Sequence, residues 1–353
     1  MQTRPSPAPW HVEVYAGTAG HSAWFSADLG QHWVHPNSHS GMYLEARVWG
    51  FSSHPARPRE LLAATDMGVF RWSEDTARWT PLPSPMNDVW ALAQAPWDAD
   101  CVIAGTRPAN LYLSRDGGTR WQKLDVPGIA HFSNINMGPT RVTQILFDPV
   151  DEGTVWATIE IGGIFRSTDG GLSWQACCEG LVSQDVHGIA AVNDGQGGKR
   201  LLATTNRGLH VSTDNGAHWQ FQALDAPWQY CRAVVPQPGK DAVVYLCNGD
   251  GPPGSTGRLW RSQDHGRSWS PLALPGSFNS TPWCLALHAH DPQLIFLATN
   301  LGQLYRSQDG GEHWQRLPHE FGEIRALHWR ASDYPSDRPA HSITVRPPVV
   351  AAA

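Results

Sequence analysis

The chain has 353 residues, a formal net charge of −6 and only 16% charged residues. This balance excludes the basic surface that is typical of nucleic-acid-binding proteins, and no apolar run approaches the length of a membrane-spanning helix. The six cysteines form no C-x-x-C pair and no zinc-binding spacing. We therefore expect no nucleic acid and no membrane among the partners of this protein.

The first nine residues, 1–9, are interpreted as an N-terminal extension. The opening MQTRPSPAPW contains no apolar core of a signal peptide, so we expect a cytoplasmic location. The run HVEVYAGTA follows, and it has the pattern of a strand. In the repeat described below it corresponds to a second strand, with no first strand before it.

A short motif, S-x-D-x-G-x-x-W, then recurs along the chain. The full copies begin at Ser26, Ser114, Ser167, Ser212, Ser262 and Ser307, and a shortened copy begins at Ser73. Successive copies lie 41 to 53 residues apart. A period of this length predicts a solenoid or a propeller rather than two ordinary domains.

One repeat, residues 141–178, shows what each unit contains. Four short runs rich in β-forming residues are separated by Asp148-Pro149, by Gly162-Gly163 and by the motif itself. This pattern predicts a four-stranded antiparallel blade with the motif in the turn between the third and fourth strands. Ser and Asp side chains can bond the backbone of such a turn, and Trp supplies a large apolar group. We therefore interpret the motif as structural rather than catalytic.

The motif identifies the chain as resembling the Asp-box, or BNR, repeat proteins over about residues 10–330. Sialidases, tandem-repeat xyloglucanases, sortilin-type receptors and a photosystem II assembly factor carry this repeat. The resemblance implies an all-β fold, a seven-bladed β-propeller of four-stranded antiparallel blades. It implies less about function, because the fold is shared by glycosyl hydrolase-like enzymes and binding modules. The R-I-P signature of sialidases does not occur in this sequence.

The two ends of the repeat region complement each other. After the last motif comes EIRALHWR, residues 323–330, which reads as a first strand with no blade behind it. We expect this strand to join the N-terminal blade, which would close the ring and leave no free sheet edge. Residues 10–330 would then form one propeller, and residues 331–353 a C-terminal tail.

The innermost strands of a propeller surround its central channel, so equivalent positions of the seven first strands are expected to lie together around it. Their first positions are Glu45, Asp88, Arg141, Asp185, Tyr230, Pro282 and Glu323. Their third positions are Arg47, Trp90, Thr143, His187, Arg232, Trp283 and Arg325. Guanidinium groups match carboxylates and phosphates, and indole faces stack on sugar rings. We therefore predict a funnel that binds an anionic ligand through Arg47, Trp90, Arg141, Arg232, Tyr230, Trp283 and Arg325.

Two interpretations of this funnel remain open. It can be a binding site for an acidic sugar, a carboxylate, a phosphate or an acidic segment of a partner protein. It can also be the active site of a glycoside hydrolase or a lyase, because glycoside hydrolysis needs two carboxylates and a histidine can act as a general base. The candidate catalytic residues are Glu45, Glu160, Asp185, His187 and Glu323. Alternatively, the arginines only form ion pairs with Glu45 and Glu323 at the rim.

No cofactor is predicted. His35 and His39 are the residues that would hold a divalent metal by residue type. Their segment, HPNSHSGMY, has the composition of an exposed loop, so a metal site is not the favoured interpretation.

Overall fold

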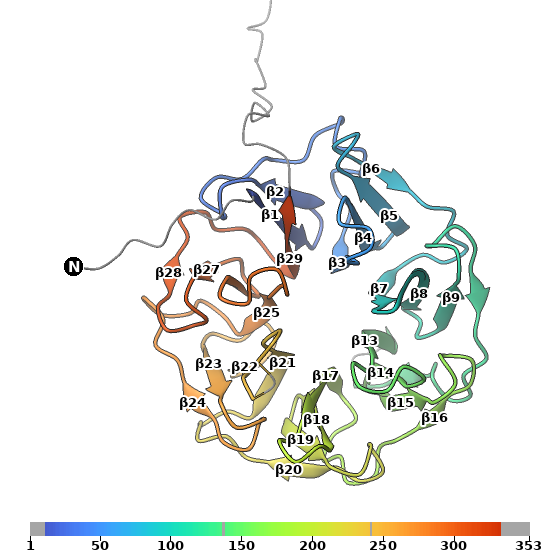
Figure 1. Ribbon diagram of the computed structural model, residues 1–353, viewed down its shortest axis with the longest axis vertical. Coiled ribbons are helices and arrows are strands. Elements are labelled where there is room, and N and C mark those ends of the chain that lie inside the picture. The colour runs from blue at the N-terminus through green and yellow to red at the C-terminus, as the bar shows by residue number, and fades with distance from the viewer. Residues whose placement is uncertain (1–10, 136–137, 241, 333–353) are drawn as a thin grey trace, which may run out of the picture.

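The computed structural model describes residues 11–135, 138–240 and 242–332. In this part of the chain seven antiparallel sheets stand around a central axis like the blades of a propeller (Figure 1). The seven-bladed all-β fold predicted from the repeat is therefore confirmed. None of the described residues forms a helix with the length and apolar character needed to cross a membrane.

Six sheets contain four strands each, in chain order. The first two are β3 (Val48–Ser52), β4 (Glu60–Thr65), β5 (Gly68–Ser73) and β6 (Arg78–Pro81), then β7 (Val89–Ala95), β8 (Asp98–Thr106), β9 (Leu111–Ser114) and β10 (Gln122–Lys123). The next two are β13 (Arg141–Phe147), β14 (Val155–Glu160), β15 (Gly163–Ser167) and β16 (Gln175–Ala176), then β17 (Val186–Asn193), β18 (Lys199–Thr205), β19 (Gly208–Ser212) and β20 (Gln220–Gln222). The last two are β21 (Tyr230–Pro236), β22 (Val244–Gly249), β23 (Gly257–Ser262) and β24 (Ser270–Pro271), then β25 (Pro282–Ala286), β26 (Ile295–Thr299), β27 (Leu304–Ser307) and β28 (Gln315–Arg316).

The seventh sheet closes the ring. Its strands are β29 (Ile324–Ser332), β1 (His11–Thr18) and β2 (Ala23–Ser26). β29 pairs antiparallel with β1 along the full length of β1, as the sequence predicted. A single bridge between Phe25 and Val34 takes the place of a fourth strand. A small hairpin, β11 (Phe132–Ser133) with β12 (Gly138–Pro139), precedes β13.

The core consists of seven apolar clusters, and each joins two neighbouring blades. The tryptophan of every motif copy packs against a different cluster: Trp33, Trp79, Trp121, Trp174, Trp219, Trp269 and Trp314. Burial of large aromatic rings is among the strongest apolar contributions available to a fold. One tryptophan for each joint between blades explains why the motif recurs seven times.

The motif turn after β15 shows the other roles. Ser167 Oγ donates to Asp169 Oδ1 at 2.7 Å and accepts the Gly171 amide at 2.8 Å, while Asp169 accepts the backbone amide of Ser173. Gly171 has a φ of 93°, a conformation that glycine adopts without strain. The turn is thus held by its own side chains, and it lies at the face of the ring where first strands connect to second strands.

Each innermost strand carries a β-bulge at the equivalent position. The extra residues are Trp49, Trp90, Thr143, His187, Arg232, Trp283 and Arg325. A bulge bends its strand and redirects the side chain of the extra residue. The register predicted from the sequence agrees at six of these positions.

The register of β3 differs from the prediction. Val48 pairs with Thr65 as Val89 pairs with Thr106, so Trp49 and not Arg47 is equivalent to Trp90. The predicted alignment was two residues out of step because Ala46 and Val48 are both buried. A strand pattern of period two does not distinguish registers that differ by two residues.

Candidate functional site

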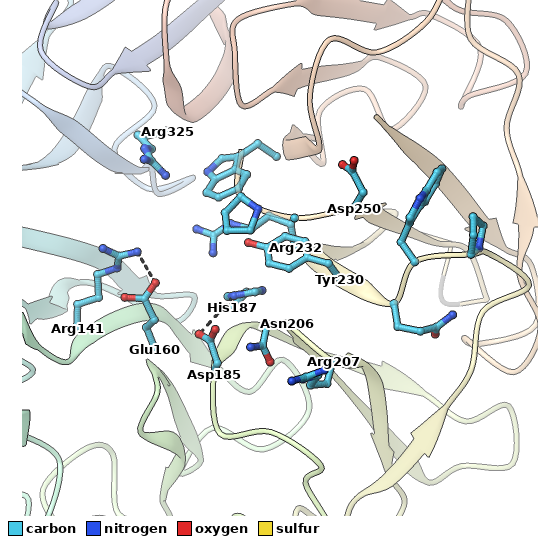
Figure 2. A pocket seen from close by; sticks show the side chains of 16 residues that line it. Arg141, Glu160, Asp185, His187, Asn206, Arg207, Tyr230, Arg232, Asp250 and Arg325 are labelled. Atoms are coloured by element: carbon cyan, nitrogen blue, oxygen red, sulfur yellow. Dashed lines mark hydrogen bonds and ion pairs between the residues drawn. The ribbon is translucent and has the colours of Figure 1, made fainter. Parts of the chain in front are cut away.

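A pocket of about 770 Å³ opens at the mouth of the central channel. It lies on the face formed by the loops between blades and the turns between second and third strands, which we call the funnel face. The pocket, called the funnel below, is lined by Arg141, Glu160, Asp185, His187, Asn206, Arg207, Pro227, Trp228, Gln229, Tyr230, Arg232, Asp250, Gly251, Pro252, Trp283 and Arg325. Figure 2 shows that side chains from separate blades converge there.

Indole rings hold the arginines of the funnel in place. The guanidinium carbon of Arg232 lies 4.0 Å from the centre of the Trp283 ring. The guanidinium carbon of Arg325, on β29, lies 5.1 Å from the centre of the same ring. Arg141 stacks in the same way on Trp90, at 4.0 Å. Cation–π contacts of this kind are worth about 0.5–2 kcal/mol each, depending on desolvation. The guanidinium groups are therefore fixed before any ligand arrives.

Trp49 completes this series of stacked side chains. Its ring lies parallel to that of Trp90, with centroids 3.9 Å apart and an interplanar angle of 12°, and Arg325 lies 5.9 Å from it. Asp88 accepts hydrogen bonds from both indole N–H groups, at 3.2 and 2.8 Å. Burial raises the pKa of Asp88, and the two hydrogen bonds oppose that rise. The faces of these indoles are thus engaged by neighbours within the protein.

The three funnel arginines differ in their charge compensation. Arg141 forms an ion pair with Glu160, and Arg325 forms one with Glu323. Within the described part of the chain Arg232 forms no ion pair with a carboxylate. Burial lowers the pKa of Arg325 to about 10; Glu323 opposes this, whereas the charges of Arg232 and Arg141 lower the pKa further. The three guanidinium groups thus lie near the carboxylates of Glu160, Glu323 and Asp185, and Arg232 is the one of the three that has no direct ion pair in the described chain.

Burial also lowers the pKa of Arg141; the charges of Glu160 and Asp185 oppose this, whereas those of Arg232 and Arg107 lower the pKa further. An anion placed among these arginines would relieve their mutual repulsion.

His187 is held by the neighbouring blade. Its Nδ1 lies 2.7 Å from the carbonyl oxygen of Cys231, so this nitrogen carries the proton and donates. Thr143, at the equivalent bulge one blade earlier, donates from Oγ1 to the carbonyl of Val186 at 2.8 Å. The same inter-blade bond made by two different residues indicates a structural task for His187, whose side chain is only 3% exposed.

The two aspartates of the funnel are anionic groups. Burial alone raises the pKa of Asp185, but the His187 imidazole, 3.4 Å from Oδ1, and the charges of Arg232 and Arg141 outweigh it, so the pKa is lowered. The hydroxyl and amide of Ser255 lower the pKa of Asp250. Neither carboxyl has the raised pKa expected of a general acid.

Tyr230 forms part of the wall beside His187. Its side chain is buried, and its ring centroid lies 4.8 Å from the imidazole. Burial raises the pKa of Tyr230 to about 12, so the phenol stays protonated at neutral pH. It presents a neutral donor to the funnel.

The structure gathers most of the predicted site residues. Arg141, Glu160, Asp185, His187, Tyr230, Arg232, Trp283 and Arg325 line the funnel, and Trp90 and Glu323 support its arginines. Glu45 and Arg47 are exposed and do not line it. Both lie outside because the register of β3 places them before the inner strand.

His35 and His39 lie elsewhere. His35 packs edge-on against Trp24, with centroids 4.5 Å apart, and its Nδ1 lies 2.6 Å from the Pro36 carbonyl. His39 is exposed. Across the described ranges, no group of three or more potential ligands from His, Cys, Asp and Glu is placed to hold a metal.

Several contributors were missing from the predicted site. Trp49 was missed because the predicted register of β3 put Arg47 in its place. Arg207, Trp228 and the Asp250–Pro252 turn come from loops that differ from repeat to repeat. Their position after second strands, or before first strands, is the signal that places them on the funnel face.

Curated relatives match this chain only distantly. It is 24% identical to an oligoxyloglucan-reducing end-specific xyloglucanase of Emericella nidulans, over 36% of this chain and 24% of that protein. It is 26% identical to a xyloglucanase of a Paenibacillus species, over 68% and 28%, and 23% identical to sortilin of Mus musculus, over 57% and 23%. The chain thus spans about a quarter of the length of these relatives.

Solved structures share the fold. A GH74 xyloglucanase from Xanthomonas campestris superposes with a TM-score of 0.59 at 23% identity, over 79% of this chain and 45% of that one. YCF48 bound to D1 peptide superposes with a TM-score of 0.57 at 16% identity, over 88% and 96%.

A family model described as the DUF6242 beta propeller domain matches residues 140–322. This segment contains β13 to β28, and with them most of the lining of the funnel. Since the match covers more than half of the 353 residues, the chain belongs to the DUF6242 β-propeller family.

Proposed function

We propose that this protein is a binding propeller whose funnel recognises an anionic group, with a carboxylate as the preferred form. The observation that carries the proposal is Arg232. Its guanidinium is fixed on Trp283, lies close enough to Arg325 and Arg141 to affect their pKa values, and has no carboxylate partner in the described chain. The planar fork of arginine binds a carboxylate with two parallel hydrogen bonds.

The indole rings support an anion over a neutral sugar. A sugar ring usually packs on an open aromatic face, but Trp283, Trp49 and Trp90 are already stacked on guanidinium groups or on each other. What the inner end offers a ligand is therefore guanidinium edges.

Hydrolysis of a glycoside is the alternative, and the xyloglucanase relatives favour it. The funnel carboxylates give it less support. Glu160 is bound to Arg141, and the lowered pKa of Asp185 and Asp250 suits a carboxylate rather than a proton donor. We therefore place binding ahead of catalysis.

A thermal-shift screen tests the proposal, because a ligand that binds only the folded state raises the apparent melting temperature. The panel contains glucuronate, galacturonate, citrate, inorganic phosphate and neutral xyloglucan oligosaccharides. We expect stabilisation by the carboxylates, loss of it in Arg232→Gln, and only partial recovery in Arg232→Lys, which keeps the charge without the fork.

Arg120→Gln is the matched control, since the Arg120 side chain is 92% exposed in a motif turn on the opposite face. A shift that survives Arg232→Gln, or is equally lost in Arg120→Gln, contradicts the proposal. Release of reducing sugar from xyloglucan oligosaccharides, abolished by Glu160→Gln, would establish the hydrolase instead.

A further inference from the structure

Exposed apolar side chains are more numerous on the funnel face than on the opposite face. Of twelve large apolar residues that are exposed in the described chain, seven lie in loops between blades or in turns between second and third strands, and only three lie in turns of the opposite face. The most exposed are Ile135 at 83%, Phe132 at 66% and Val182 at 65%. Exposed apolar and aromatic groups on one face of a molecule are typical of protein interfaces. A small anion inside the funnel would leave them uncovered.

The funnel itself has two chemically different ends. Arg141 and Arg325 lie at the inner end, whereas Asp250 lies at the opposite, outer end (Figure 2). Pro252 follows Asp250 by two residues, and the Asn248 Nδ2 group donates to the backbone carbonyl of Trp228 at 3.1 Å. The lining of the funnel thus also contains an indole and a proline ring, which suits an uncharged, apolar group.

Two buried acceptors, Asp185 Oδ1 and Asn206 Oδ1, lie between the two ends (Figure 2). Asn206 Oδ1 has no hydrogen-bond partner in the described chain, and Asp185 Oδ1 has the His187 imidazole 3.4 Å away. A buried acceptor is stabilised by a donor, and the N–H groups of an extended peptide supply such donors at regular intervals. The funnel therefore offers charge complementarity to an acid, acceptors to a backbone, and an apolar wall to a neighbouring side chain.

We propose that the ligand of the funnel is an extended segment of a partner protein. An Asp or Glu side chain enters the inner end and meets Arg232. A neighbouring apolar residue packs on Trp228 and Pro252, and the body of the partner covers the apolar residues of the funnel face. This proposal rests on the proposed anion-binding function and names the molecule that carries the anion.

A selection from a random twelve-residue peptide display library tests it, with the full-length protein as bait. We expect the enriched peptides to share an Asp or Glu at a fixed spacing from an apolar residue. A synthetic peptide of the enriched sequence should bind at least tenfold more weakly when its acid is changed to the amide, and to Arg232→Gln. Trp228→Ala should weaken binding of the peptide severalfold.

The controls are matched by residue type and face. Arg120→Gln and Trp97→Ala lie on the opposite face, where Trp97 is 42% exposed, and both should bind the peptide like wild type. Enrichment without an acid, or no enrichment, overturns the peptide proposal. Binding of polygalacturonate with no enriched peptide also overturns it. In each case, glucuronate stabilisation that is lost in Arg232→Gln would leave the anion-binding function standing, whereas its absence would remove both.

Discussion

Arg325 and Arg330 lie five residues apart on β29 and serve opposite purposes. Arg330 is 3% exposed and binds Glu13 and Glu74 as well as the Pro58 carbonyl. Although burial lowers the pKa of Arg330, Tyr15, Glu13 and Glu74 hold it above the ordinary value. Arg325 has one carboxylate partner and two arginine neighbours, and its pKa is lowered to about 10.

The degree of pairing distinguishes buried charges that stabilise the fold from buried charges that serve a site. A buried charge that contributes to the fold is fully paired, because an unpaired one is expensive. Arg330 meets this rule where it joins β29 to β1 and to the next blade, and so closes the ring. Arg325 is paired with Glu323 alone and Arg232 has no ion pair in the described chain, and incomplete compensation is a mark of functional sites.

The largest expected effect is on ring closure. Arg330→Met removes the shared partner of Glu13 and Glu74 and leaves both carboxylates without it. We expect the free energy of unfolding to fall by about 3–5 kcal/mol, measured by urea denaturation at neutral pH. A loss below about 1 kcal/mol would show that the ring does not depend on this network.

A smaller effect is expected from Trp283, which holds two funnel arginines in place and is not expected to contact the ligand directly. Trp283→Leu removes the platform of Arg232 and Arg325. Loss of about 1 kcal/mol of cation–π stabilisation corresponds to roughly fivefold weaker binding of a carboxylate, measured by isothermal titration calorimetry. Unchanged affinity in a folded variant would show that the arginines are held by other contacts.

The motif turns should respond to acid. Hydrogen bonds from Ser173 hold the pKa of Asp169 at about 2, below the ordinary value of 3.8. Burial raises the pKa of Asp264, but hydrogen bonds, the largest from Ser268, outweigh burial and hold this pKa at about 2 as well. A depressed folded pKa means that the stabilisation is present above pH 3.8 and is lost as the pH falls toward 2. In Asp169→Asn the melting temperature should fall less steeply than in wild type as the pH is lowered from 3.8 toward 2. An unchanged dependence of the melting temperature on pH would mean that other groups cause the sensitivity to acid.

The smallest effect is expected at the other arginine of β29. Arg325→Met removes an ion pair but also relieves repulsion with Arg232 and Arg141. Its change in the free energy of unfolding should stay below about 1 kcal/mol, by the same urea titration used for Arg330→Met. A loss comparable to that of Arg330→Met would erase the distinction between the two sites.

The sequence allowed the fold to be predicted because one local device repeats. The motif needs only its own turn and one tryptophan, so its spacing alone indicated seven blades, and the strand after the last copy indicated ring closure. The register of β3 was not predictable, since Ala46 and Val48 are both buried and fit either alignment equally well.

The site was harder to predict than the fold. Residue types suggested arginines and tryptophans around the channel, but not that Trp90 would stack on Trp49 and Arg141. That arrangement depends on contacts between blades, which no single repeat contains. The outer end of the funnel lies in loops such as Asp250–Pro252 that have no counterpart in other repeats.

The most direct measurement is the affinity for glucuronate of Arg325→Met and Arg330→Met, determined by isothermal titration calorimetry at a temperature where both are folded. We expect Arg325→Met to bind glucuronate at least tenfold more weakly than wild type. Arg330→Met, although much less stable, should bind glucuronate like wild type. Equal affinities in the two variants, or a loss confined to Arg330→Met, would contradict the assignment of the funnel as the anion-binding site.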